Sequence, residues 1–195
     1  MNRAEASQKL GDDSENNFFV ISDYKGYTPI RADRRQNKYE HWDIRIYIKD
    51  KWVRVDVKAP KDKRFDITYL EIIGITGKNG WLLGKADYIA FQQEGHFIYF
   101  KRRDLLNWFF KKIGLNSINE IREIYNKTFD KEGKPLYDDL DLSYSNDDYF
   151  VDKKSDSLYK LYSRSPWNGN ARHDVMTMVK IEDMKNDLNY WEYKL

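Results

Sequence analysis

Two aspartates and one lysine are the residues of this chain whose types and spacing best suit chemistry. Asp43 lies in residues 41–48, and Asp56 and Lys58 lie in residues 52–58. Both segments alternate apolar and polar residues, which predicts two β-strands joined by a short turn. Carboxylates on neighbouring strands of a hairpin can lie within a few ångströms of each other. We therefore expect the two aspartates to form a pair on one face of the hairpin.

Such a pair of carboxylates suits a divalent cation. Mg²⁺ and Mn²⁺ prefer hard oxygen ligands such as carboxylate and water. Asp56 and Lys58 are two residues apart, so their side chains point to the same side of the strand. An ammonium group there can orient or deprotonate a water and stabilise charge on a phosphate, while the metal polarises the phosphate. The pattern predicts a phosphodiester hydrolase.

The motif alone carries little information. Asp56-Val57-Lys58 is one of six D/E-x-K tripeptides in the chain, and it differs from the others by lying in a strongly alternating strand that follows a strand with another acid. An alternative interpretation places Asp43 and Asp56 on the exposed face of a half-solvated hairpin. Their partners would then be surface cations, namely Arg45, Arg54 or Lys58. The spacing leaves both interpretations open.

Residues 8–113 resemble the PD-(D/E)XK nuclease superfamily. The motif residues are Glu15 in an expected first helix, Asp43, and Asp56-Val57-Lys58. Residues 77–91 are also similar to a segment of phage-type members. The sequence departs from the family pattern at Trp42, where a proline often precedes the first aspartate, and at Asp56, where glutamate is frequent.

This resemblance implies a fold, a metal and an activity. The fold is α/β, with a restriction-endonuclease-like mixed β-sheet flanked by helices and a C-terminal strand–helix extension. Asp43 and Asp56 become ligands of Mg²⁺ (or Mn²⁺), with Glu15 as an accessory ligand, and Lys58 becomes the water-activating base or charge stabiliser. For Glu15 an exposed helix acid is the alternative. The implied activity is that of a DNA endonuclease, and a homodimer is one option because many such nucleases pair to cut both strands.

Basic residues flank the expected site. The net charge of the whole chain is +2, but residues 25–64 contain 13 Lys and Arg against 6 Asp and Glu. Cations beside an acidic metal site can neutralise the phosphates of a polyanionic substrate. A solvated charged face is the alternative, and for a C-terminal arginine a plain turn. The candidate DNA contacts are Arg31, Arg34, Arg35, Lys38, Lys61, Lys63, Arg64 and Arg172.

The remaining segments predict one nuclease domain over residues 1–195, with a core at about 4–113. We expect a basic loop at 30–40, an acidic insertion at about 128–157 with 4 Lys and Arg against 9 Asp and Glu, and C-terminal strands and a helix at 158–195. Periodicity and capping patterns predict the other elements. They are helices at 4–22, 104–113, about 117–124 and 182–193, and strands at 67–73, 87–91, 96–100, 158–163 and 174–181.

Composition narrows the class of protein. The chain has no cysteine, which excludes disulfides and thiolate metal sites. No apolar run reaches the roughly 20 residues that span a bilayer, and the N-terminus is too polar for a signal peptide. We expect a cytoplasmic protein of a bacterial or phage-infected cell. The rival functions are an RNA- or junction-directed nuclease, a non-catalytic nucleic-acid-binding protein that retains the nuclease fold, and a partner-binding protein that uses its acidic insertion.

Overall fold

The computed structural model describes residues 3–60, 64–74, 77–128, 150–151, 158–164 and 174–194. The chain forms two compact units, each assembled from separate stretches. Unit 1 contains residues 1–68, 84–105 and 181–195, and unit 2 contains residues 69–83 and 106–180. The expectation of a single nuclease domain stays a prediction.

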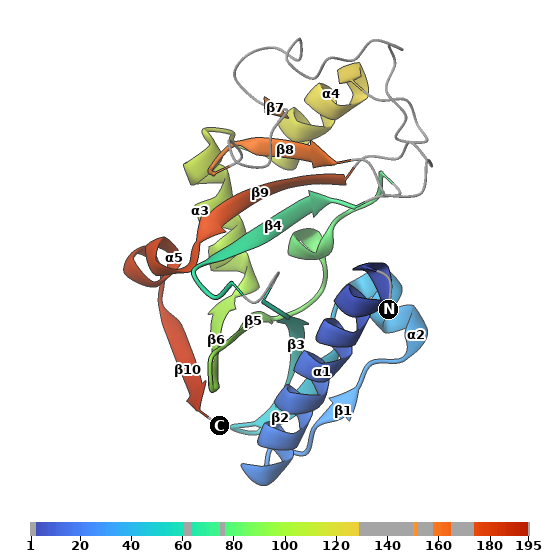
Figure 1. Ribbon diagram of the computed structural model, residues 1–195, viewed down its shortest axis with the longest axis vertical. Coiled ribbons are helices and arrows are strands. Elements are labelled where there is room, and N and C mark those ends of the chain that lie inside the picture. Colours follow the sequence, from blue (N-terminus) through green and yellow to red (C-terminus); the bar gives the residue numbers. More distant parts are fainter. Residues whose placement is uncertain are drawn as a thin grey trace. The chain divides into compact units, whose positions relative to one another are not determined.

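Unit 1 is built on a six-stranded sheet with the order β1-β2-β3-β5-β6-β10 (Figure 1). The hairpin strands β2 (Ile44–Ile48) and β3 (Lys51–Lys58) are antiparallel, as are β5 (Tyr88–Gln93) and β6 (His96–Lys101). The two hairpins are joined by the parallel pairing of β3 with β5. The mixed α/β class is therefore confirmed, with a sheet that is mostly antiparallel.

Both predicted hairpins form, and their turns explain the register. Lys49 and Asp50 link β2 to β3 with positive φ angles of 48° and 61°. Two successive residues with positive φ make the mirror-image turn whose twist matches that of paired strands. In the second hairpin Gly95 takes the positive φ, at 71°. In the first, two residues with side chains adopt a backbone that usually favours Gly or Asn.

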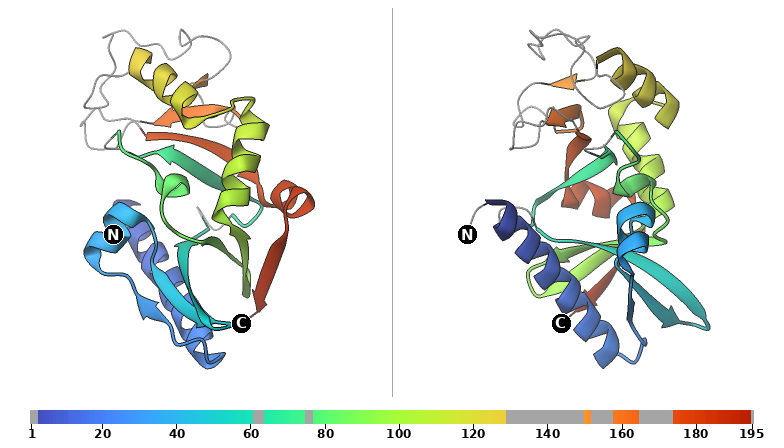
Figure 2. Two further views of the ribbon diagram at one scale, coloured as in Figure 1. Left: turned by 180° about the vertical axis from the view of Figure 1, so that it is seen from behind. Right: turned by 90° about the vertical axis from the view of Figure 1, so that its right-hand side faces the viewer.

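Helix α1 (Arg3–Tyr24) lies along this sheet beside β2 and β3 (Figure 2). It ends where Gly26 adopts a φ of 76° and the amide of Tyr27 donates to the carbonyl of Ser22, which is the usual bond of a glycine-terminated helix. The predicted first helix is confirmed and is about one turn longer than expected.

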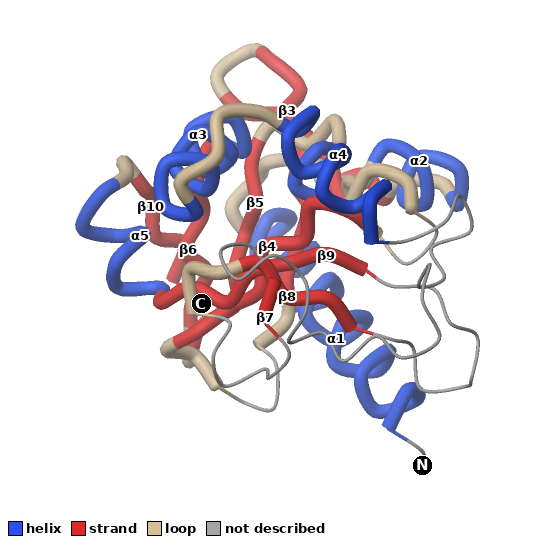
Figure 3. The backbone as a smooth tube through the Cα atoms, turned by 90° about the horizontal axis from the view of Figure 1, so that it is seen from above, coloured by secondary structure: helices blue, strands red, loops and turns tan. Residues whose placement is uncertain are grey.

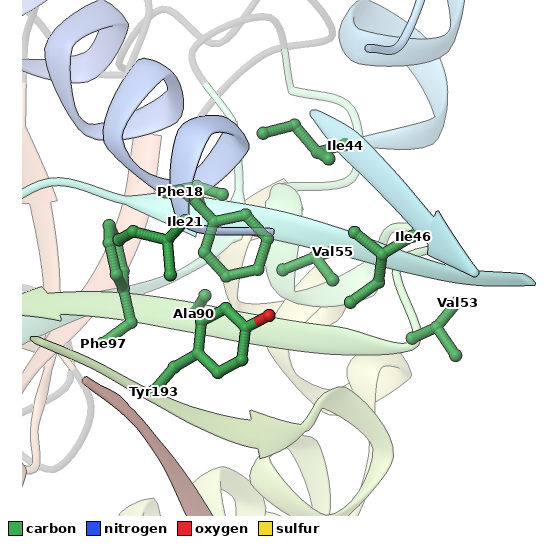
Figure 4. Packing of buried hydrophobic residues seen from close by; sticks show 10 residues of the cluster. Phe18, Ile21, Ile44, Ile46, Val53, Val55, Ala90, Phe97 and Tyr193 are labelled. Atoms are coloured by element: carbon green, nitrogen blue, oxygen red, sulfur yellow. The ribbon is translucent and has the colours of Figure 1, made fainter. Parts of the chain in front are cut away.

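The hydrophobic core of unit 1 lies between α1 and the sheet (Figure 4). Phe18 packs edge-on against Phe97 at a centroid distance of 5.2 Å and lies 5.9 Å from Tyr193. The valines of β3 form the inward face of that strand, as its alternation predicts. The buried members are Phe18, Ile21, Ile44, Ile46, Val53, Val55, Val57, Ala90, Phe97 and Tyr193.

Residues 30–40 are not the loop that their basic composition predicts. They contain the short strand β1 (Ile30–Arg31), paired antiparallel with β2, and the helix α2 (Arg34–Glu40). Asp33 caps this helix by accepting from the amide of Gln36, whose side chain accepts from the amide of Asp33 in return. The reciprocal pair is a capping box, which favours a helix start at this point even though the basic composition of the segment suggests a loop.

The expected C-terminal helix is also wrong in its second half. Helix α5 (Ile181–Asp187) ends early, and β10 (Tyr190–Lys194) pairs antiparallel with β6. Aromatic residues are enriched in strands, and this strand provides three of them. The last strand thereby covers the edge of β6.

Unit 2 contains a four-stranded sheet with the order β4-β9-β8-β7, whose strands are drawn in red and overlap in the view of Figure 3. Its strands are β4 (Ile67–Ile73, whose first two residues belong to unit 1), β9 (Asp174–Lys180), β8 (Leu161–Arg164) and β7 (Phe150–Val151). The unit also contains the 3-10 turn η2 (Trp81–Leu83), helix α4 (Ile118–Thr128) and most of α3 (Arg102–Ile113). The expected strands and helices at these positions are confirmed, but they form a second sheet rather than one continuous sheet. Almost all of the expected acidic insertion lies outside the described residues.

Candidate functional site

Asp43 is held at the start of the first hairpin, just before β2. Its side chain is buried, and both carboxylate oxygens accept hydrogen bonds. The amide of Val57 donates to Oδ2 at 2.7 Å, and the side-chain amide of Asn37 donates to Oδ1 at 2.5 Å. The carboxylate therefore bridges α2 and β3 and has a fixed orientation.

Asp56 is more deeply buried, with 2% of its surface exposed. The Nζ atom of Lys58 lies 2.8 Å from Oδ1, whereas Oδ2 is buried without a hydrogen-bond partner. Burial raises the pKa of Asp56 well above its usual value, and the ammonium of Lys58 opposes this. The charge of Asp43 and a hydrogen-bonding interaction between the two carboxyl groups add to the rise. The exposed face of the alternative interpretation is wrong, because both aspartates are buried. Its ion pair between Asp56 and Lys58 is present, whereas Arg54 pairs with Asp87.

Glu15 approaches this group from α1 and is half-buried. The pKa of Glu15 is raised to about 7, with burial as the main cause; the charge of Asp43 contributes to the rise, while Arg31 and Lys58 oppose it. A guanidinium nitrogen of Arg31 lies 3.9 Å from Oε2 of Glu15. The charges of Asp43 and Lys58 thus act on Glu15 within unit 1, and its role as an accessory metal ligand stays a prediction.

Asn37 is the site residue that sequence reasoning missed. It contacts Asp43 only because residues 34–40 fold into α2. A loop was expected there, so the direction of the Asn37 side chain could not be predicted. The available signal was the Asp33-x-x-Gln36 capping pattern. A second unforeseen contact joins α1 to β5, where the hydroxyl of Ser14 donates to the side chain of Gln92.

The candidate DNA contacts differ in whether other side chains of the chain already bind them. Arg31 is bound within unit 1, since it donates to Asn16 and lies 4.8 Å from the ring centroid of Phe19 in addition to its contact with Glu15. Two others take part in ion pairs, Arg35 with Glu40 at 3.7 Å and Arg64 with Asp66 at 2.8 Å. Arg34 and Lys38 lie on α2. Three candidates, Lys61, Lys63 and Arg172, lie outside the described residues.

Glu40 anchors α2 beside the site. Its carboxylate accepts from the indole of Trp42 at 3.1 Å and from Lys85 at 3.3 Å. The hydrogen bond from Trp42 is the main reason that the pKa of Glu40 is lowered. Trp42 itself is buried, and its bond to Glu40 supports α2, the helix that carries Asn37.

The donor set fits a divalent cation in part. Among the described residues no three acidic or histidine side chains converge as a ready metal cage. Mg²⁺, however, commonly binds through one or two carboxylates and keeps several waters. Asp43 and Asp56 supply two carboxylates, and the partnerless Oδ2 of Asp56 is the kind of buried acceptor that a cation satisfies.

Comparison of the chain with protein-family models, curated proteins and solved structures finds no match. The resemblance to the PD-(D/E)XK superfamily therefore stays a prediction from the motif residues. None of the described helices is long and apolar enough to cross a membrane.

Proposed function

We propose that unit 1 is a Mg²⁺-dependent nuclease that hydrolyses phosphodiester bonds of DNA. The observation that carries this proposal is the buried Asp56, whose Oδ2 has no partner and whose Oδ1 contacts Lys58 at 2.8 Å. A buried carboxylate without full hydrogen bonding costs free energy, and such groups concentrate at functional sites. The neighbouring carboxylate of Asp43 makes a structural ion pair alone a poor explanation, because its negative charge raises the pKa of both Asp56 and Glu15.

Each side chain has a role that follows from its position. Asp43 and Asp56 would hold the cation, with Glu15 at its margin. The bonds from Val57 and Asn37 keep the carboxylate of Asp43 in one orientation. When bound, Mg²⁺ supplies polarisation of the phosphate and a lower pKa for an attacking water. Lys58 can donate to a phosphate oxygen and stabilise the charge that develops during cleavage.

The basic helix α2 suggests how a polyanion would meet this site. Arg34 lies three residues before Asn37, so the two share a face of the helix, and Asn37 contacts Asp43. Arg34 and Lys38 are therefore the described cations that we assign to backbone phosphates, a role that orients a strand without reading its sequence. DNA is the proposed substrate because such contacts fit any phosphodiester chain and the motif resembles that of DNA endonucleases.

The proposal is tested with supercoiled plasmid and the full chain in Mg²⁺, with EDTA as the metal-free control. We expect nicking that requires Mg²⁺ and that falls by about 100-fold or more in Lys58→Ala, as for loss of a group that stabilises transition-state charge. Lys9→Ala is the matched control, since that exposed lysine pairs with Asp13 on α1. Normal cutting by folded Lys58→Ala would contradict the mechanism.

A second readout does not depend on turnover. Mg²⁺ that binds the folded protein raises its melting temperature, and we expect this rise in the original chain but not in Asp56→Asn. Asp66→Asn, an exposed aspartate paired with Arg64, is the matched control. A Mg²⁺-induced rise without cutting of plasmid, single strands, junctions or RNA would favour a binding protein that retains the site. An equal rise in Asp56→Asn would refute the metal site.

A further inference from the structure

A hollow lies in unit 1, on the face of the sheet that carries the valines of β3. Its volume is about 240 Å³, and Val53, Val55, Ile46 and Ile48 form part of its wall. Asp56 and Lys58 alternate with these valines along β3 and so belong to the opposite face. Six aromatic side chains also line it, namely Phe18, Tyr27, Tyr88, Tyr99, Trp191 and Tyr193.

Four of the six rings form two stacked pairs, and Tyr88 meets Tyr99 and Trp191 edge-on. Tyr99 and Trp191 stack with centroids 5.9 Å apart and planes inclined by 17°, and Tyr27 and Tyr193 stack at 5.8 Å and 18°. Trp191 is 40% exposed, although it lies in a strand that closes the sheet. Parallel rings of this kind are platforms on which a flat heterocycle can stack, which contributes substantial binding free energy for nucleic-acid bases.

One buried polar group points into this hollow. Tyr193 is 7% exposed, and among the described residues its hydroxyl has no partner at hydrogen-bond geometry. Hydrogen-bonding interactions with the side chains of Ser22 and Tyr27 contribute to its pKa, although neither reaches the geometry of a full hydrogen bond. Figure 4 shows the hydroxyl directed toward Val55 and Ile46, both of which line the hollow. A ligand with a polar edge would provide the missing hydrogen bond.

The surroundings of the hollow are cationic. Lys49 and Lys51 line it, the ammonium of Lys25 lies 5.0 Å from the ring centroid of Tyr193, and that of Lys101 lies 5.9 Å from the centroid of Trp191. No acidic side chain belongs to its described lining, although Asp50 sits between two of the lysines in the turn. An aromatic cage for a cationic ligand is disfavoured by these four charges, whereas an anionic group is favoured.

We propose that this hollow binds one nucleotide, with its base among the aromatic rings and its phosphate beside Lys49 and Lys51. The volume is below the roughly 300 Å³ at which pockets for larger ligands begin, so it suits one ring system rather than a row of stacked bases. The hollow lies on one face of β3, and Asp56 and Lys58 lie on the other. The nucleotide in the hollow therefore does not contain the phosphodiester bond that is cut. The proposal is therefore independent of the nuclease function.

The test is isothermal titration of the full chain with AMP in EDTA, with adenosine, ribose 5-phosphate and an unphosphorylated octanucleotide as comparison probes. We expect saturable binding of AMP, about tenfold weaker binding of adenosine, and none of ribose 5-phosphate. Trp191→Ala should weaken AMP binding by about tenfold or more through loss of the stacking platform. Lys51→Glu should weaken AMP binding by about fivefold and leave adenosine unchanged.

Lys111→Glu, the same charge change on an exposed lysine of unit 2, is the matched control and should bind AMP normally. If Trp191→Ala does not fold, Lys51→Glu still decides the matter, because its side chain is exposed at the start of β3. No saturable binding of AMP would overturn the proposal, as would equal effects of Lys51→Glu and Lys111→Glu. Octanucleotide binding that is tighter than AMP binding and is weakened by Trp191→Ala would also overturn it, since a strand would then be the ligand of the hollow.

Discussion

At the scale of single residues, burial sets the protonation of the groups that matter most in unit 1. It is the largest cause of the raised pKa of Glu15, Asp56, Tyr99 and Tyr193. For the acids, this raises the cost of gathering negative charge in one place, which a bound cation would relieve. For the tyrosines it has a consequence that is measurable without any ligand.

The alkaline stability of the protein should depend on Tyr99, whose pKa burial raises to about 12. An unfolded tyrosine loses its proton near pH 10. The folded state holds its proton over this interval, so the stabilisation is fully present below pH 10 and is lost as pH rises toward 12. In Tyr99→Phe the free energy of unfolding should therefore fall less steeply with pH above pH 10. The slope should change by roughly the amount that corresponds to one bound proton.

The measurement is urea unfolding followed by circular dichroism from pH 8 to 11.5, with the original chain as the reference at every pH. Burial also raises the pKa of Tyr193, so this residue should account for the dependence of stability on pH that remains in the variant. Identical slopes for the two proteins above pH 10 would show that the Tyr99 hydroxyl ionises alike in the folded and unfolded chain.

At the scale of elements, Gly80 is required by the close approach of two segments of unit 2. A Cβ atom added there would lie 2.7 Å from the carbonyl oxygen of Glu71, and the amide of Gly80 donates to the carbonyl of Ile72 at 2.9 Å. Backbone cannot move aside as a flexible side chain can. We expect Gly80→Ala to lose about 1–3 kcal/mol of unfolding free energy, the usual cost of overpacking.

Gly11→Ala is the matched control for this substitution. Gly11 lies inside α1, and a Cβ there would meet nothing within 4 Å. The same change should therefore stabilise the protein by about 0.5–1 kcal/mol, because alanine loses less backbone entropy in a helix. Both values come from urea unfolding at pH 7. A Gly80→Ala variant as stable as the original chain would mean that β4 and the segment before η2 can separate at little cost.

Much of the element order was accessible from the sequence, because it depends on local signals. The alternation of β2 and β3, the apolar spacing of α3 and the glycine after α1 all act over a few residues, and the structure confirms them. Asn37 and the strand β10 were missed for a different reason. Asn37 contacts Asp43, six residues away, only because the segment between them folds into α2, and β10 depends on pairing with β6, which is distant in the chain. For the candidate site, the cluster of acids with Lys58 was predictable, whereas the orientation of Asp43 and the lone Oδ2 of Asp56 were not.

At the scale of the whole molecule, each unit is assembled from separate stretches of the chain. Unit 1 joins residues 1–68 and 84–105 to residues 181–195. Its sheet is completed when β10 pairs with β6, from Tyr190 opposite Phe100 to Lys194 opposite His96. Such pairing between distant segments has a high loop-closure cost, so it persists only if the side chains it brings together bury substantial apolar surface.

Tyr193 should therefore be a main stabilising contact of unit 1. It is buried and lies against Phe18, Tyr27 and Tyr99, which come from three other parts of the chain. Tyr193→Ala should cost about 3–5 kcal/mol of unfolding free energy, as for other large aromatic truncations in a core. Glu192→Ala is the matched control, because that neighbour in β10 is exposed, and it should change stability by less than about 0.5 kcal/mol.

Hydrogen exchange separates two explanations of such a loss. If Tyr193 joins the C-terminal strand to the rest of unit 1, Tyr193→Ala should accelerate exchange of the amides of β10 and β6 together and, more weakly, those of α1 around Phe18. Faster exchange confined to β10 would mean that this strand frays alone. In that case the sheet would be stable with five strands, and residues 188–195 would add little to the stability of unit 1.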